Sequence, residues 1–387
     1  MSARRMNARR RAAIVGVAES AVGETPHLTV LSQQAIASRA ALAEAGLRRA
    51  DVDALFVAGN WSWAPALALA EYLGLQPRYL DGTNIGGSSF EAHLGHAAAA
   101  IEAGLIDVAL IAYGSTQRSD RSRNAPRPAT LGEQFERPFG LPLPVGAYAL
   151  AANRYLHQYG VRGEQLAEVA VSAREWARLN PDAYHRNPLT VDDVLASPMI
   201  CEPLHKLDCC LVTDGGGAVV VAAEDRWTDV ATRPVVVLGY GETTTHHTIA
   251  NMPDLTVTGA AQSGSAALAM AGVTRDNIDL LEIYDSFTIT VLLTLESLGF
   301  CKPGEGGEFV SGGRTAPGGS LPMNTNGGGL SYTHPGMYGI FLLIEATRQL
   351  RHDYTDPRRQ VPDADLALVH GTGGVLSSTA TVVLGRG

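Results

Sequence analysis

The sequence from Asn324 to Leu350 reads NTNGGGLSYTHPGMYGIFLLIEATRQL, a glycine-rich turn followed by an apolar pattern of helical period. From Ile340 onward the apolar residues recur three and four positions apart, which predicts a helix with one face in a core. His334 and Pro335 stand where we expect this helix to begin, because proline is sterically welcome in a first helical turn. The stretch therefore places a histidine beside a flexible turn at a helix start.

A similar pattern occurs in the first half of the chain. Residues 83–89 read TNIGGSS and precede a predicted helix at 90–103, while residues 325–331 read TNGGGLS and precede the later helix. Coincidence is one explanation in so glycine-rich a chain. The shared context of strand, turn and helix favours an ancient duplication instead.

The rest of the chain alternates between strand-like and helix-like runs, which predicts an α/β fold with parallel strands covered on both faces. We expect an N-terminal half at 1–230, including an excursion at 114–200, and a C-terminal half at 231–387 that shares one core with it. Strands are expected at 12–17, 54–59, 78–83, 108–113, 214–222, 235–239, 280–284, 366–369 and 379–385, and helices at 30–45, 66–73, 90–103, 145–159, 163–179, 259–271 and 288–298.

The composition excludes several classes of function. A net charge of -9 over 387 residues argues against nucleic acid as a partner. No apolar run reaches the length of a membrane span, so we expect a cytoplasmic protein without one. The four cysteines form neither a disulfide framework nor a pair of CxxC motifs, and the adjacent His246 and His247 lack a third ligand in register. The sequence therefore predicts no metal site.

The turn at 84–90 offers chemistry through its backbone. Glycine allows close approach of a ligand, and the start of a helix presents unpaired N–H groups to developing negative charge. Ser88 or Ser89 is the alternative, as a nucleophile, yet neither lies in a GxSxG motif and no dedicated base is evident nearby. Phosphate-binding glycine spacings are absent. We favour an oxyanion site over a serine nucleophile.

A second cluster of candidates lies where a predicted strand meets a helix, in the run EIYDSFT at 282–288. Tyr284 is a weak acid with an ordinary pKa near 10, and beside a cation or oxyanion donors it can act as general acid or base. The alternative is a packed tyrosine, with Asp285 capping the following helix. His334 offers an N–H donor for an enolate oxygen or, alternatively, a cap for a helix start. Tyr332 lies on the loop and can face a pocket.

The runs GGSSF at 86–90, YDSFT at 284–288 and SYTHP at 331–335 resemble elements of the thiolase superfamily. They are similar to its lipid-transfer-protein type, and within that type to the steroid side-chain-cleaving aldolases. Thiolases use two cysteines, and both are missing here. Gly87 stands roughly where the acyl-accepting cysteine belongs, and Gly371 most nearly fills the position of the second.

The resemblance implies a five-layer αβαβα fold with two duplicated halves, a homodimer, a CoA thioester as substrate and no cofactor. It also implies a separate partner with a zinc ribbon and an OB-fold. The Arg- and Pro-rich segment 114–143 should frame the substrate entrance, with Arg118, Arg121 and Arg123 near CoA phosphates or near the partner. By analogy the substrate is a 17-hydroxy steroid with a three-carbon CoA side chain, which is cleaved to a 17-ketosteroid and propionyl-CoA.

A retro-aldol reaction is consistent with the missing cysteines, because it needs no covalent carrier. The expected roles are Tyr284 and Tyr332 as the acid-base pair, His334 as a polarising donor, backbone N–H groups at Gly87 and Gly371 in the oxyanion hole, and Ser88 and Asp285 at the binding site. Two alternatives stay open. One is an acyltransferase of the same fold that uses Ser88 or Ser89, and the other is a non-catalytic subunit that binds acyl-CoA or lipid.

Overall fold

The computed structural model describes residues 10–120 and 131–387. Within these ranges one mixed sheet runs in the order β3-β2-β4-β7-β1-β8-β11-β10-β9. Its strands are β1 (Ala12–Glu19), β2 (Ala54–Val57), β3 (Tyr79–Asp81), β4 (Val108–Ser115), β7 (Gly215–Ala223), β8 (Val235–Thr244), β9 (Leu280–Ile283), β10 (Leu366–Gly373) and β11 (Ser378–Arg386). A separate ribbon contains β5 (Met199–Cys201) and β6 (Leu204–His205).

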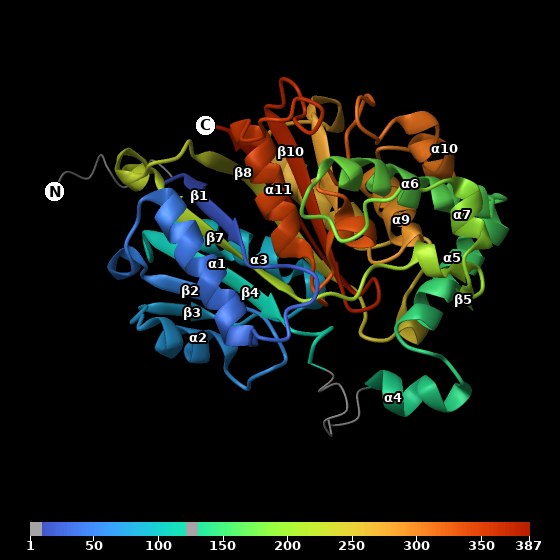
Figure 1. Cartoon of the computed structure of the whole chain (residues 1–387), viewed down its shortest axis with the longest axis horizontal. Helices are drawn as coiled ribbons and strands as arrows, with labels where there is room; N and C mark the ends of the chain where they lie inside the picture. The colour runs from blue at the N-terminus through green and yellow to red at the C-terminus, as the bar shows by residue number, and fades with distance from the viewer. Residues whose placement is uncertain (1–9, 121–130) are drawn as a thin grey trace.

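Helices and half-sheets alternate in layers (Figure 1), and three clusters of buried apolar residues lie between these layers. The outer helices on the N-terminal side are α1 (Val30–Ala45) and α2 (Pro65–Leu73), the central ones are α3 (Ser89–Glu102) and α11 (Gly339–Arg351), and the outer ones on the C-terminal side are α8 (Ala260–Ala271) and α9 (Thr288–Leu298). Smaller or peripheral helices are α4 (Leu131–Phe135), α5 (Val145–Tyr159), α6 (Gly163–Leu179), α7 (Val191–Ala196) and α10 (Gly306–Val310). The predicted αβαβα architecture is confirmed.

The two half-sheets repeat one topology. The order β2-β4-β7-β1 in the first half corresponds to β9-β10-β11-β8 in the second, with one parallel pair followed by antiparallel pairs in each. Helices α3 and α11 precede equivalent strands, β4 and β10, and an antiparallel contact between β1 and β8 joins the halves. The duplication is therefore visible in the strand order. The sheet is mixed, however, whereas the sequence pattern predicted parallel strands.

The segment after the C-terminal turn differs from the prediction. We expected a helix to begin at His334 and Pro335, but α11 begins at Gly339. The intervening backbone is held from outside the segment, because the Tyr113 hydroxyl donates to the carbonyl oxygen of Pro335 at 2.5 Å and accepts from the Met337 amide at 3.1 Å. His334 therefore lies on an irregular stretch, where its direction is set by tertiary contacts.

The predicted excursion is only partly described. Arg121 and Arg123 lie outside the described residues, so their expected place at a substrate entrance is not assigned. Arg118 is described, and its guanidinium contacts Glu24 at 3.2 Å and the carbonyl oxygen of Val212 at 3.3 Å. No helix in the described part of the chain is long and apolar enough to cross a membrane.

Candidate active site

Tyr284 and His334, both from the C-terminal half, form a hydrogen-bonded pair. Tyr284 directly follows β9, and its backbone N–H donates to the carbonyl oxygen of His370 at 2.9 Å. Its hydroxyl lies 2.9 Å from Nε2 of His334, and the two rings meet edge to face with centroids 5.6 Å apart. Both side chains are buried, with 4% and 8% of their surface exposed. The structure thus brings together two of the three predicted catalytic residues.

The backbone of His334 is fixed by a threonine that the sequence did not single out. The His334 N–H donates to Oγ1 of Thr213 at 2.9 Å, and the Thr213 N–H donates to the carbonyl oxygen of His334 at 3.3 Å. The same hydroxyl also lies 2.7 Å from Oγ1 of Thr333. Thr213 therefore holds the loop from both sides and limits the positions that the His334 ring can take.

The chemistry of the pair follows from its burial. Burial raises the pKa of the Tyr284 hydroxyl well above its usual value, because a phenolate would be poorly solvated there. The hydroxyl is therefore neutral, and it can accept a proton only while passing its own proton on. The imidazole of His334 lies within the 2.6–3.2 Å range of such a transfer. The pair is suited to relay a proton at the Tyr284 oxygen.

Gly87 lies against the ring of Tyr284, in the short turn Gly86–Ser88 that leads into α3. A β-carbon at Gly87 would lie 2.1 Å from Cε2 of Tyr284 and 2.6 Å from the carbonyl oxygen of Thr372. A side chain at this position would therefore require the tyrosine ring or the neighbouring strand to move. The tyrosine ring therefore occupies the space where a residue larger than glycine would project from this turn.

Both serines of this turn are used by the turn itself. The Ser88 hydroxyl donates to the carbonyl oxygen of Ile85 at 3.0 Å and lies 2.9 Å from the hydroxyl of Ser378. The Ser89 hydroxyl donates to the carbonyl oxygen of Gly86 at 2.6 Å and accepts from the Ile85 amide at 3.0 Å. Both side chains are fully buried. These contacts give neither hydroxyl a histidine or lysine as a base, which argues against a serine nucleophile.

At Gly371 the neighbouring group is a carboxyl that the sequence reasoning missed. A β-carbon on this residue of β10 would lie 2.2 Å from Oε2 of Glu91 and 2.8 Å from Cα of Ser88. Glu91 is in the first turn of α3 and is 1% exposed. Burial raises the pKa of its carboxyl to about 8, so it is protonated at neutral pH. The only sequence signal was an acidic residue inside an alanine-rich helix.

The histidine next to Gly371 is part of the core. His370 is fully buried, and its Nδ1 lies 2.8 Å from Oγ1 of Thr381 on the neighbouring strand. Burial lowers the pKa of its ring to about 3, so the ring stays neutral at physiological pH. It contributes to the site through its backbone carbonyl oxygen, which accepts a hydrogen bond from the Tyr284 amide.

Asp285 does not cap the helix that follows it. The helix α9 begins after Phe287, and the carboxylate of Asp285 instead accepts from the amides of Gly329 and Leu330 at 2.6 and 3.1 Å. Burial raises the pKa of this carboxyl to about 7, against the effect of those two amides. Asp285 therefore ties the β9 junction to the turn that carries His334, and it orders the site without touching the reacting groups.

Tyr332 faces a different part of the molecule. Its ring packs edge-on against Phe341, with centroids 6.3 Å apart, and it lines a cleft of about 1160 Å³. Neither Tyr284 nor His334 lines this cleft. Burial raises the pKa of the Tyr332 hydroxyl well above 10, and Glu19 adds to this effect. Tyr332, the expected partner of Tyr284 in an acid-base pair, therefore lines a cleft to which neither Tyr284 nor His334 contributes.

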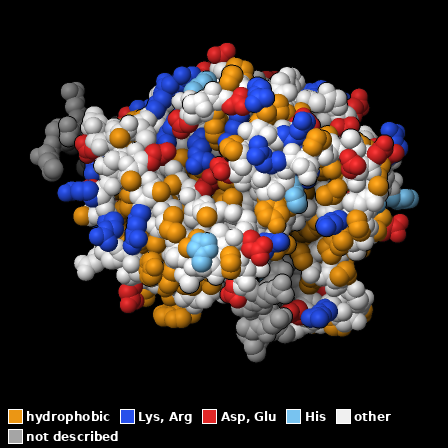
Figure 2. All heavy atoms as spheres, in the orientation of Figure 1, with side chains coloured by type: hydrophobic (Ala, Val, Ile, Leu, Met, Phe, Trp, Pro, Cys, Tyr) orange, Lys and Arg blue, Asp and Glu red, His pale blue; other side chains and the backbone are white. Residues whose placement is uncertain are grey.

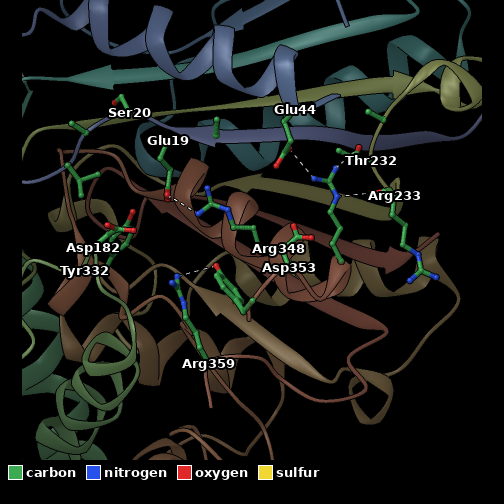
Figure 3. Close-up of a pocket in the computed structure, with 16 residues that line it drawn as sticks. Glu19, Ser20, Glu44, Asp182, Thr232, Arg233, Tyr332, Arg348, Asp353 and Arg359 are labelled. Carbon is green, nitrogen blue, oxygen red and sulfur yellow. Dashed lines mark hydrogen bonds and ion pairs between the residues drawn. The ribbon is translucent and has the colours of Figure 1, made fainter. Parts of the chain in front are cut away.

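The cleft beside Tyr332 is rich in charge, and its charges are largely paired. Figure 2 shows basic and acidic side chains close together where the surface is hollowed, and Figure 3 shows Tyr332 and Asp182 at one end of the cleft. Arg348 contacts Glu19 at 2.9 Å, as Figure 3 also shows. Two further arginines in the lining also have carboxylate partners, Arg351 with Glu44 and Arg359 with Glu345. Three of the four arginines in the described lining are therefore paired with carboxylates, which disfavours this cleft as the site for the substrate phosphates.

None of the four cysteines takes the place of the two missing thiols, although Cys210 lies near enough to Tyr284 to add, after burial, to the raised pKa of its hydroxyl. All four are free, and none lies in the turns at Gly87 or Gly371. Burial raises the pKa of Cys209 and Cys301 to about 12, which disfavours the thiolate. In residues 10–120 and 131–387 there is also no group of three His, Cys, Asp or Glu that could hold a metal ion.

Comparison with known proteins shows which family the chain belongs to. Residues 241–386 match the family described as thiolase C-terminal domain-like. The 17-hydroxy-3-oxo-4-pregnene-20-carboxyl-CoA lyase of Mycobacterium tuberculosis (strain ATCC 25618 / H37Rv) is 33% identical over 97% of this chain and 99% of that protein. The chain belongs to the thiolase superfamily. Its relatives place it in the lipid-transfer type, which includes sterol carrier protein 2 of Oryctolagus cuniculus at 29% identity over 63% of this chain and 45% of that protein.

Solved structures of the superfamily agree with the layered fold. The Ltp2-ChsH2(DUF35) aldolase matches with a TM-score of 0.89 and 30% identity, over 97% of this chain and 98% of that chain. Human mitochondrial 3-ketoacyl-CoA thiolase matches with a TM-score of 0.74 at 18% identity, over 97% and 99% of the two chains. The second likeness supports the thiolase fold alone.

Within the superfamily, overall identity does not separate the reactions. The acetyl-CoA acetyltransferase of Methanothermobacter thermautotrophicus (strain Delta H) is 31% identical over 97% of this chain and 99% of that protein. That value is close to the value for the lyase. The choice between acyl transfer and aldol cleavage therefore depends on the groups at Gly87, Gly371 and Tyr284.

Proposed function

We propose that the chain is a retro-aldolase that cleaves a β-hydroxyacyl-CoA to a ketone and a shorter acyl-CoA. The observation that carries the proposal is the position of Tyr284. Its ring fills the space beside Gly87, and its hydroxyl is hydrogen-bonded to His334. An acid-base group therefore stands where acyl transfer would need a thiol, and carbon–carbon cleavage without a covalent intermediate uses such a group directly.

The reaction can be followed atom by atom. The Tyr284 oxygen takes the proton of the β-hydroxyl while its own proton passes to Nε2 of His334. The bond between the α and β carbons breaks, the β carbon becomes a ketone, and the bonding electrons form the thioester enolate. A proton then returns to the α carbon and releases the shorter acyl-CoA. Charge develops on the enolate oxygen, where positioned donors such as the N–H groups near Gly87 are worth about 3–4 kcal/mol each.

For the substrate we propose a 17-hydroxy steroid with a three-carbon CoA side chain, which gives a 17-ketosteroid and propionyl-CoA. Two relatives of similar identity support this choice: the lyase described above and a steroid side-chain-cleaving aldolase of Thermomonospora curvata (strain ATCC 19995), 32% identical over 97% of each chain. Identity near this level supports the reaction type more strongly than the ring system, so smaller β-hydroxyacyl-CoA esters belong in the same assay.

We also propose that the chain works as a homodimer with a DUF35 partner, a protein with a zinc ribbon and an OB-fold. The similar solved structure is that of an Ltp2-ChsH2(DUF35) aldolase. The partner proposal is supported by exposed rings near α4, where Phe135 and Phe139 are 64% and 88% exposed. The edge strand β3 and the adjacent α2 expose Leu80 and Tyr72, which supports a contact between copies.

The test is to purify the chain alone and together with a DUF35 protein encoded beside it, and to assay both against the steroid ester and a shorter β-hydroxyacyl-CoA. We expect a ketone and a shorter acyl-CoA in equal amounts, formed mainly by the complex. Acyl transfer to a second CoA ester, with no ketone, would contradict the aldolase proposal. Full activity of the chain alone would contradict only the proposal that it needs a DUF35 partner.

A further inference from the structure

We propose that Glu91 is the catalytic acid that returns a proton to the α carbon of the enolate. This inference rests on the proposed function and adds a residue to it. Tyr284 and His334 account for the proton that leaves the hydroxyl group, but the pair then holds that proton away from the carbon. Tyr332, expected as the second member of an acid-base pair, lines another cleft. The site therefore needs a second proton donor.

Glu91 lies at the site because two glycines, Gly371 and Gly339, leave room for its carboxyl. A β-carbon on Gly371 would lie 2.2 Å from Oε2, and one on Gly339 would lie 2.4 and 2.7 Å from the two carboxyl oxygens. The β-carbon on Gly339 would also lie 2.3 Å from the carbonyl oxygen of Gly87. The carboxyl therefore packs between bare backbone of β10 and of the start of α11, next to the turn that contacts Tyr284.

The carboxyl is held there without the hydrogen bonds that a structural role requires. Apart from a contact with the amide of Glu91 itself, neither oxygen has a hydrogen-bond partner among the described residues. Although α11 begins nearby, none of its amides donates to this group. Burial of an unpaired polar group costs free energy, so stability of the fold does not explain a glutamate at this position. A polar group that converges on a site without structural partners is what a reacting group needs.

The protonation state suits the role. The carboxyl has a pKa of about 8 through burial, so it carries a proton at neutral pH. Tyr284 and His370 share the region, and their shifted pKa values keep both neutral there. When Glu91 gives its proton to carbon it becomes a carboxylate, and His334 then holds the proton from the substrate hydroxyl. Transfer of that proton through solvent from His334 to Glu91 resets the site, so protons and electrons balance.

The experiment uses the complex with the DUF35 partner and compares Glu91→Gln with Glu102→Gln, an exposed glutamate at the other end of α3. Cleavage of the β-hydroxyacyl-CoA is measured first. Exchange of the α protons of propionyl-CoA with D₂O, in the absence of ketone, is measured second. We expect Glu91→Gln to lower both rates at least about 100-fold, the usual range for loss of a general acid. Glu102→Gln should match the wild-type protein.

If the wild-type complex cleaves the ester and Glu91→Gln cleaves and exchanges at the same rates, Glu91 is not the catalytic acid. The proposal of an aldolase would still stand. A wild-type complex that neither cleaves nor exchanges any ester would contradict the proposed function itself. If Glu91→Gln does not fold, the wild-type pH profiles decide. Cleavage needs the protonated carboxyl and should fall above about pH 8, whereas exchange begins with the carboxylate and should rise there. An exchange rate that is flat through this range would overturn the assignment.

Discussion

The two duplicated turns, one before α3 and one before α11, begin with similar sequences and end in different structures. In the first, α3 starts at Ser89, directly after the short turn, and the serine hydroxyls bond back to the turn. In the second, α11 is delayed to Gly339, and the extra residues carry His334 into the site. The first turn thus supplies backbone and the second a side chain. The two halves share a topology, but the later start of α11 gives the second turn a catalytic side chain that the first turn lacks.

We expect the largest effect from Tyr284→Phe, because Tyr284 lies between the two turns and contacts both. We expect cleavage to fall by about 10²–10⁴-fold, since only the proton-relaying hydroxyl is lost. The fold should persist, with a change in unfolding free energy of about 1 kcal/mol. The matched control is Tyr159→Phe, at the C-terminal end of α5. Turnover of Tyr284→Phe at the control rate would remove Tyr284 from the mechanism.

Gly87→Cys tests whether the first turn can regain a thiol. A β-carbon there would clash with Tyr284 at 2.1 Å, so we expect a loss of about 1–3 kcal/mol in unfolding free energy and loss of cleavage through displacement of the ring. Denaturant unfolding and intact mass after incubation with acyl-CoA provide the measurements. A stable variant that forms an acyl-enzyme would show that the tyrosine does not block this position.

Glu91→Gln should change how stability depends on pH. The folded pKa is raised to about 8, above the value in an unfolded chain, so the folded state binds more protons between about pH 4.5 and 8. Wild-type stability therefore falls as pH rises through this window, on the order of a few kcal/mol at most. The Gln variant cannot ionise and should lose this component, becoming relatively more stable near pH 8. Parallel pH profiles of the two proteins in thermal unfolding would contradict the buried, protonated carboxyl.

Tyr332→Phe should have the smallest effect. Its hydroxyl faces Glu19 and the charged cleft, so we expect cleavage within about threefold of wild type, well below the size of a lost acid-base group. Steady-state kinetics against Tyr284→Phe provide the comparison. A loss as large as that of Tyr284→Phe would restore Tyr332 as the acid and weaken the assignment of Glu91.

Features set by local sequence were predicted correctly, whereas features set by contacts between distant parts of the chain were not. Helices at Val30–Ala45 and Thr288–Leu298 were predicted to the residue, because apolar period and a terminal glycine are local signals. The start of α11 was wrong because Tyr113, more than 200 residues earlier, fixes the intervening backbone. At the site, Tyr284 and His334 came from motifs. Glu91 was missed, and the cleft that Tyr332 lines was not foreseen, because side-chain direction depends on neighbours from other strands.

The central claim is carbon–carbon cleavage at Tyr284 and His334 without a covalent acyl-enzyme. The most direct test is to mix the complex with a β-hydroxyacyl-CoA, stop the reaction during turnover, and measure protein mass and products together by mass spectrometry. We predict ketone and shorter acyl-CoA in equal amounts, with the protein mass unchanged at every time point. An acyl adduct that forms and decays at the rate of turnover, on a serine of the first turn or on any cysteine, would contradict the claim.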